Sequence, residues 1–418
     1  MKSIWIPLAV FLGLLLALGN MAPVFAAGSV FVSGLTQPAG IVATPYKLLF
    51  TVPYSIGNPR LIMSVDSLGA VTLFATLPNR PISELPAEEY IAISPGLGGF
   101  PASFVYVVQG TNIVQVTPDG LTVSVFATIP SLPCSHSGIA FDHVGTFGFD
   151  MIISAGGGGG CGGPTGEVWR VNSAGVATLV ATVTGTPTPI LEGPEVAPLG
   201  FAPYGGQIVL ASENFGGGTV FAVSAAGVVS TVASVADAED VRFIPPNPCN
   251  FGSSGGSYFQ TRYSDTPGAS SIWKFPQTDL VGLGGSALVG GEYSGALTLL
   301  TSNGVSITSS TFATGLPDIQ EGSTIVDCTV PGPPSPVGGT VRGVDDVALL
   351  SPWLAVLGVV GCMATVGVFV RTRRRQSQQA EVSCAIQLMR RTLSRTWTSY
   401  RAPTRSALAM EQRTRRMR

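Results

Sequence analysis

Charged side chains are scarce in this sequence of 418 residues. Only 11% of the residues are Asp, Glu, Lys or Arg, against roughly a quarter in an average soluble protein. This shortage excludes a coiled coil, a helical repeat array and an acidic disordered chain. Glycine is abundant, with 53 residues, but the glycines keep no three-residue period, and collagen is therefore excluded as well.

Residues that commonly carry catalysis are also rare. The chain contains two histidines, His136 and His143, so a serine triad would have few available bases. The glycine run 156–160 is not followed by Gly-Lys-Ser/Thr, and we therefore expect a flexible loop there and not a phosphate-binding loop. No Cys-x-x-Cys pair indicates zinc or redox chemistry.

The charges that are present divide the chain into two parts. Residues 28–344 contain 20 acidic and eight basic side chains, whereas the residues after Val370 contain 13 arginines and two acids. A membrane that separates the two parts would explain this division.

Two apolar segments support a membrane location. Residues 1–26 combine a basic start, an apolar stretch and a small-residue cleavage site, which predicts a signal peptide, with an uncleaved anchor as the alternative. Val347–Val370 is a run of 24 uncharged residues, long enough to cross a bilayer, with a buried core helix as the alternative. Because arginines follow at once, we expect a single-pass protein of the cell membrane, with its bulk extracytoplasmic and its C-terminus cytoplasmic.

One motif recurs in the exported part. It consists of a glycine, an alternating run, and then Phe or Val, Ala, and Thr or Ser. Its copies begin at Gly69, Gly120, Gly175, Gly227 and Gly304. The first four glycines lie 51, 55 and 52 residues apart, and the last gap of 77 residues implies an insertion or a degenerate extra unit. Each unit contains about four short β-rich runs, which predicts one β-propeller blade per unit.

We therefore expect an all-β protein in which residues 27–330 form a β-propeller of six four-stranded blades, followed by one C-terminal transmembrane helix. Five or seven blades are the alternatives. The run Ser29–Leu35 resembles the end of the motif without its beginning. It is predicted to supply the outer strand of the last blade and so close the ring. Six inner strands are predicted to start near Gly40, Glu89, Gly138, Glu195, Asp240 and Gly322.

The segment 137–180 begins SGIAFDHVGTFGFDMIISAGGG and ends GEVWRVNSAGVATLV. It resembles the NHL and SMP-30/gluconolactonase-like group of propellers, and the resemblance extends over most of residues 29–328. The resemblance implies the propeller fold, and it implies much less about activity. Metal-dependent lactonases of this group place a metal site at the centre of one face.

Four cysteines lie in the exported part, where disulfides are expected. In a propeller, Cys134 and the loop that holds Cys161 share one face, whereas Cys249 and Cys328 each follow an inner strand and lie on the opposite face. We therefore predict the disulfides Cys134–Cys161 and Cys249–Cys328.

Acidic residues recur at one position of the aligned inner strands. The aligned residues are His136, Glu192, Glu239 and Glu321, and we expect them near the central axis as candidate metal ligands. Two further acids, Glu213 and Glu292, end second strands on the same face and are candidate binding residues. Converging carboxylates repel one another, and Ca²⁺ is the cation that suits such oxygen ligands. The alternatives are solvated carboxylates at the rim, or acids that accept backbone N–H bonds.

The last part of the chain is predicted to attach the protein to the membrane. Residues 331–346 are a Pro/Gly-rich stalk, 347–370 the transmembrane helix and 371–418 an Arg-rich cytoplasmic tail. The region 338–375 resembles the C-terminal anchoring regions of prokaryotic surface proteins, without their LPxTG or Pro-Glu-Pro signals. We expect the tail to contact anionic lipid in preference to nucleic acid.

Three functions are consistent with these features. The first is a membrane-anchored, extracytoplasmic module that binds an unidentified ligand or protein on its acidic face, together with calcium. The second is a metal-dependent hydrolase of the lactonase or esterase type, with Glu192, Glu239 and Glu321 around the ion. The third is a structural envelope protein. The sequence favours a binding module over an enzyme.

Overall fold

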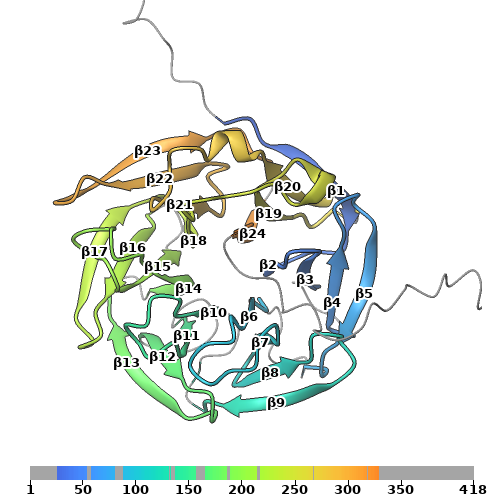
Figure 1. Ribbon diagram of the computed structural model, residues 1–418, viewed down its shortest axis with the longest axis horizontal. Helices are drawn as coiled ribbons and strands as arrows, with labels where there is room; N and C mark the ends of the chain where they lie inside the picture. The colour runs from blue at the N-terminus through green and yellow to red at the C-terminus, as the bar shows by residue number, and fades with distance from the viewer. Residues whose placement is uncertain are drawn as a thin grey trace, which may run out of the picture. The chain divides into compact units, whose positions relative to one another are not determined.

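The computed structural model describes residues 26–53, 58–80, 88–130, 132, 137–156, 165–185, 189–213, 217–266, 268–317 and 319–328. These residues belong to one compact unit, Met1–Ser335. They form six four-stranded antiparallel sheets, arranged as blades around a common axis (Figure 1). The prediction of an all-β propeller with six blades is confirmed.

Four blades are continuous in sequence, each running from an inner strand to an outer strand. Blade 1 consists of β2 (Ile41–Ala43), β3 (Leu48–Val52), β4 (Leu61–Val65) and β5 (Val71–Thr76). Blade 2 consists of β6 (Ile91–Ile93), β7 (Val105–Gln109), β8 (Asn112–Val116) and β9 (Val123–Thr128). Blade 3 consists of β10 (Ser137–Phe141), β11 (Met151–Ala155), β12 (Gly166–Val171) and β13 (Ala177–Val183). Blade 4 consists of β14 (Ile190–Val196), β15 (Ile208–Glu213), β16 (Thr219–Val223) and β17 (Val229–Ser234).

The last two blades are interleaved in sequence. Blade 5 consists of β18 (Ala238–Phe243), β21 (Ala287–Gly291), β22 (Leu297–Ser302) and β23 (Ile307–Ala313). The hairpin of β19 (Tyr258–Tyr263) and β20 (Ser270–Phe275) follows β18 in the chain but lies in blade 6. The inner strand of blade 6 is β24 (Ile319–Ile325). The long gap between the last two motif copies is therefore explained by an insertion, and that insertion supplies half of the next blade.

The N-terminal strand closes the ring. β1 (Ser29–Leu35) pairs antiparallel with β20, from Ser29 opposite Lys274 to Leu35 opposite Ser270. It is the outer strand of blade 6, as predicted. Blade 6 thus combines three separate parts of the chain: β1, the β19–β20 hairpin and β24.

A disulfide ties two of these parts together. Cys249, in the connection from β18 to β19, is bonded to Cys328, which follows β24. The backbone N–H of Cys249 also donates to the carbonyl of Val326 at 3.1 Å. The predicted pair Cys249–Cys328 is confirmed.

Several other predictions fall outside the described residues. They are the pair Cys134–Cys161, residues 1–25 of the predicted signal peptide, the stalk, the transmembrane helix and the Arg-rich tail. In the part of the chain that the structure describes, no helix has the length and apolar character needed to cross a bilayer.

The repeated motif corresponds to a turn followed by a β-bulge. Its glycine lies in the turn between the third and fourth strands of a blade, with φ of 78° at Gly120, a conformation that favours glycine. Between β4 and β5 the register passes from Ile62 opposite Ala75 to Met63 opposite Leu73, so that Phe74 is the extra residue. The equivalent extra residues in blades 2 to 5 are Phe126, Val180, Val232 and Phe312.

The turn and the bulge also join neighbouring blades. A β carbon at Gly120 would lie 2.2 Å from the carbonyl oxygen of Phe74, the bulged residue of the preceding blade. A β carbon at Gly227 would lie 2.5 Å from the carbonyl oxygen of Val180 in the same way. The motif therefore sets how closely one blade packs on the next.

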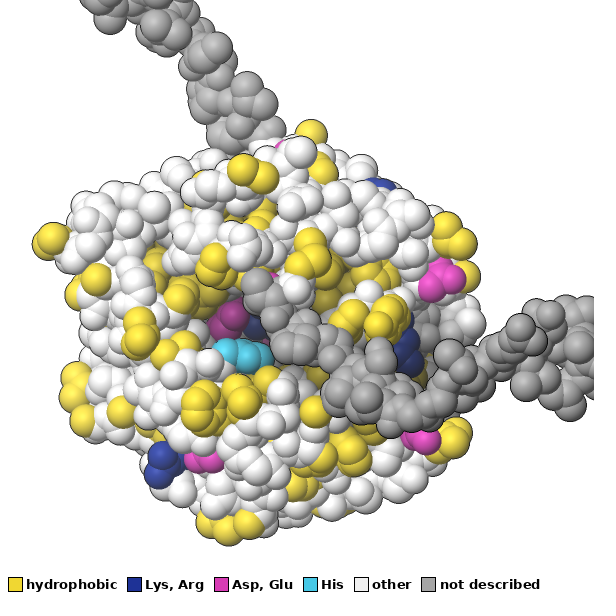
Figure 2. Space-filling view, in the orientation of Figure 1, with side chains coloured by type: hydrophobic (Ala, Val, Ile, Leu, Met, Phe, Trp, Pro, Cys, Tyr) yellow, Lys and Arg dark blue, Asp and Glu magenta, His cyan; other side chains and the backbone are white. Residues whose placement is uncertain are grey.

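Apolar side chains fill the spaces between the blades. Between blades 2 and 3, for example, Phe100 and Tyr106 meet Phe141 edge to face, with ring centroids 5.1 and 5.6 Å apart. Figure 2 shows one face of the ring, on which hydrophobic and uncharged side chains predominate and charged ones are few. This face is therefore as poor in charge as the composition implies.

Replacing the turn glycine should be more costly where a blade packs against it. We expect Gly304→Ala to lower the free energy of unfolding by about 1 kcal/mol, because of its φ of 90° alone, since open space surrounds this residue. Gly120→Ala should cost at least about 1 kcal/mol more, because its β carbon would overlap Phe74. Urea unfolding followed by tryptophan fluorescence measures both, and equal losses would contradict the proposed role of the motif in blade packing.

Candidate functional site

A close approach of the inner strands brings acidic side chains together at the axis. Gly193 in β14 has a φ of 43°, and a β carbon there would lie 2.3 Å from the Cα atom of Asp240 in β18. Only glycine permits this approach. The residues immediately before these two positions are Glu192 and Glu239, which therefore lie close together at the N-terminal ends of two inner strands.

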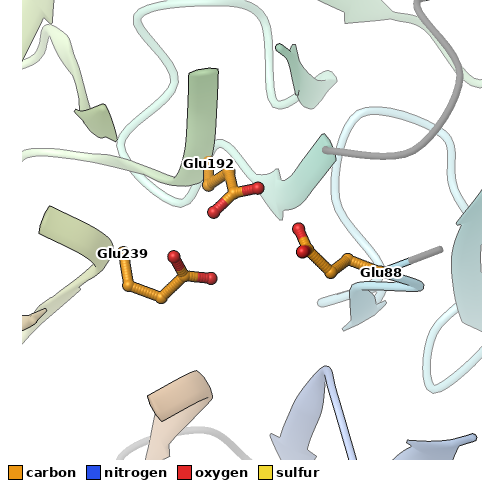
Figure 3. A group of neighbouring side chains, drawn as sticks. All are labelled: Glu88, Glu192 and Glu239. Carbon is orange, nitrogen blue, oxygen red and sulfur yellow. The ribbon is translucent and has the colours of Figure 1, made fainter. Parts of the chain in front are cut away.

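Three carboxylates from three blades converge at this point. One oxygen atom from each of Glu88, Glu192 and Glu239 lies within 4.8 Å of the other two. Figure 3 shows the three carboxyl groups directed toward a common space. Glu192 and Glu239 are each 1% exposed and Glu88 is 5% exposed. We call these three residues the axial carboxylate group.

The other predicted site residues lie around this group, as far as they are described. Glu321 in β24 is 1% exposed, and its Oε1 atom accepts no hydrogen bond from any described residue. Its charge interacts with those of Glu88 and Glu239. Glu213 ends β15 and Glu292 directly follows β21, and both are buried. His136 falls outside the described residues.

The prediction from sequence missed Glu88. This residue lies three positions before β6, in the run Glu88-Glu89-Tyr90. The run matches Glu239-Asp240-Val241 at the start of β18, and this similarity was the available signal. In both runs the first acid joins the axial carboxylate group.

The second acid of each run is bound by donors from its own surroundings. Arg60 Nε lies 3.0 Å from Glu89, and the side-chain amide of Gln109 donates to the same oxygen at 3.0 Å. Asp240 accepts hydrogen bonds from Gln320 at 2.8 Å and from Ser323 at 2.5 Å. These acids are thus structural, whereas the axial carboxylate group is surrounded by other acids.

Burial and mutual repulsion raise the pKa of the axial carboxyl groups. The pKa of Glu192 lies well above its ordinary value because the group is desolvated and because Glu239 and Glu88 are close. Burial also raises the pKa of Glu239, although the hydroxyl of Tyr90 donates a hydrogen bond to it. The pKa of Glu321 is raised by burial and then by its acidic neighbours. These groups are held close together in an environment that disfavours their charge.

Either protons or a cation can relieve this repulsion. Ca²⁺ takes oxygen ligands at about 2.3–2.6 Å. Three oxygens within 4.8 Å of one another can therefore share one such ion. All the converging ligand atoms are carboxylate oxygens, which suit a hard cation and not a soft one. The residues present fit a calcium ion.

The fold and the site together define a six-bladed β-propeller with a buried carboxylate group on its axis. No family model matches the chain, and no curated protein sequence does. The periplasmic gluconolactonase PpgL of Pseudomonas aeruginosa is similar in structure, with 13% identity, a TM-score of 0.40, and 72% of this chain and 76% of that one covered.

Two further solved structures are similar at the same level. The soluble aldose sugar dehydrogenase of Escherichia coli has 12% identity and a TM-score of 0.42, covering 68% of this chain and 89% of its own. The GH93 α-L-arabinofuranosidase of Fusarium graminearum has 10% identity and a TM-score of 0.41, covering 70% and 87%. Similarity this weak says nothing about what this chain binds or catalyses.

The raised pKa values predict how stability depends on pH without divalent ions. A carboxyl group whose pKa is higher in the folded chain contributes its full stabilisation below its ordinary pKa of 4.5, and this contribution is lost as the pH rises through the folded value. We therefore expect the free energy of unfolding in EDTA to fall steadily from pH 4.5 upward. Glu195, whose pKa burial raises to about 7, adds to the fall within that interval.

Urea midpoints measured in EDTA between pH 4.5 and pH 8 check this expectation. Glu239→Gln should reduce the fall of the urea midpoint over the whole range from pH 4.5 to pH 8. Glu195→Gln should remove only the part of the fall that ends near pH 7. A midpoint that rises with pH in EDTA would show that the axial carboxyl groups are not repelling one another.

Proposed function

We propose that this protein is a membrane-anchored, extracytoplasmic six-bladed propeller that binds Ca²⁺ on its axis and presents a ligand-binding surface around the ion. The observation that carries the proposal is the convergence of three buried carboxylates from blades 2, 4 and 5. The acidic composition of residues 28–344 supports an exported domain. The apolar segment Val347–Val370 and the arginines after it support the membrane anchor.

The burial of the acids favours a cation over water as their partner. Glu88, Glu192 and Glu239 are at most 5% exposed, and a buried carboxylate without a compensating charge is strongly disfavoured. The Oε1 atom of Glu321, which accepts no hydrogen bond from the described residues, supplies a further oxygen near the group. Bound Ca²⁺ would neutralise two of these charges and tie three blades together.

A hydrolase of the lactonase or esterase type is the second candidate. The observation that favours it is the contact between the Tyr90 phenol and Glu239, within a group of carboxyl residues of raised pKa. Such residues are candidates for proton transfer. Turnover in a screen of lactones and esters, abolished in Glu239→Gln, would move the assignment to this class. If no lactone or ester is turned over, the binding module remains the proposed function.

Calcium should stabilise the full chain measurably. In detergent micelles, the melting temperature should rise by several degrees when Ca²⁺ replaces EDTA, because a ligand at 100 times its Kd adds about 2.7 kcal/mol to the stability of the folded state. Glu192→Gln and Glu239→Gln should each lose most of this rise. The rise should also grow between pH 5 and pH 8, since Ca²⁺ binds the ionised carboxylates.

The matched control is Glu195→Gln. Glu195 lies on the same strand as Glu192, but its carboxylate accepts the backbone N–H of Phe243 at 2.8 Å. This variant should keep the full response to calcium. An equal response in all variants, or no response in the wild-type chain, would rule out the axial calcium site. Fractionation of the full chain against a chain that ends at residue 330 tests the membrane anchor separately.

A further inference from the structure

A second acidic pair lies on the same face, outside the axial carboxylate group. Glu213 is the last residue of β15 in blade 4, and Glu292 directly follows β21 in blade 5; they are 4% and 5% exposed. The carboxyl group of Glu292 interacts with that of Glu213 and with the phenol of Tyr293. A carboxyl group, a second carboxyl group and a phenol are thus held together at the junction of two blades.

This pair has capacity for a ligand. The Oε2 atom of Glu292 is buried and accepts no hydrogen bond from any described residue. Tyr293, the next residue, is 51% exposed. The acidic pair is therefore buried beside an aromatic side chain that solvent reaches.

The backbone of Glu292 is held on both sides. Its N–H donates to the carbonyl of Asp237 at 2.7 Å, and its carbonyl accepts the N–H of Gln320 at 3.0 Å. Asp237 immediately precedes β18, and Gln320 lies in β24. Glu292 is thus fixed between the inner strands of blades 5 and 6, as a binding residue should be.

We propose that Glu213, Glu292 and Tyr293 form a second subsite, which binds the ammonium group of an organic ligand beside the axial cation. This proposal rests on the proposed function, because it makes the acidic pair the place where the ligand of the calcium-bound propeller is recognised. The ammonium group would donate hydrogen bonds to Glu213 and Glu292. The ring of Tyr293 would contact the cation or the adjoining carbon chain.

The composition of the subsite favours an ammonium group over a second metal ion. The phenol of Tyr293 is not among the usual ligands of Ca²⁺, which are carboxylate, carbonyl and water oxygens. A second divalent ion would also be repelled by an ion in the axial carboxylate group. An ammonium group carries one charge and three N–H donors, which match buried acceptor oxygens. An adjacent aromatic face adds a cation–π attraction.

The test uses n-butylammonium as the probe and 1-butanol as its neutral counterpart. Calorimetric titration of the full chain in detergent micelles, at pH 7 and saturating Ca²⁺, should detect n-butylammonium and not 1-butanol. Glu292→Gln and Glu213→Gln should weaken binding of n-butylammonium at least tenfold. Both variants should keep the calcium-induced rise in melting temperature, which shows that they are folded. Glu195→Gln is the control and should bind the probe as the wild type does.

The possible failures are distinguishable from failure of the proposed function. A normal calcium response without n-butylammonium binding overturns the second subsite alone. Binding of n-butylammonium that disappears as Ca²⁺ saturates the protein also overturns it, since the probe would then occupy the axial carboxylate group. The absence of any calcium response overturns the proposed function, whatever the probe does.

Discussion

Closure of the ring is the constraint on which the rest of the molecule depends. A four-stranded blade cannot cover its own two apolar faces, so each blade needs a neighbour on both sides. Blade 6 completes the circle only when β1, the β19–β20 hairpin and β24 come together. The first and last described strands and an internal hairpin thus meet in one sheet. The position of each inner strand around the axis follows from this closure.

The acidic axis is a consequence of the same geometry. Glu88, Glu192 and Glu239 belong to blades 2, 4 and 5, and no local structure brings them together. Their separation is set by how closely the inner strands pack, which in turn requires glycine at position 193. The stability of the ring is therefore opposed by charge repulsion at its centre. An ion that relieves the repulsion would act on several blades at once.

The features of the fold that follow from the repeated motif could be predicted from the sequence. The recurrence of the motif predicted the blades, and the isolated run Ser29–Leu35 predicted the closing strand, since each depends on a local pattern. The interleaving of blades 5 and 6 could not be predicted, because nothing local in the β19–β20 hairpin shows which sheet it joins.

The site was predicted in part for the same reason. Glu192, Glu239 and Glu321 share a position at the start of their strands, which alignment detects. Glu88 precedes a strand of three residues, too short to align well. The pairing of Glu89 with Arg60 depends on a contact across the fold and could not be predicted from the sequence.

The disulfide has a mechanical consequence. β24 is the last described strand, and a pulling force applied to the chain beyond it enters the ring at Cys328. Its bond to Cys249 passes part of that tension to the connection before β19, the strand beside β24. The load is then shared between two adjacent strands, and β24 cannot be drawn out of the ring on its own. The Cys249–Cys328 bond is thus the covalent link at which the ring resists a force on the chain beyond β24.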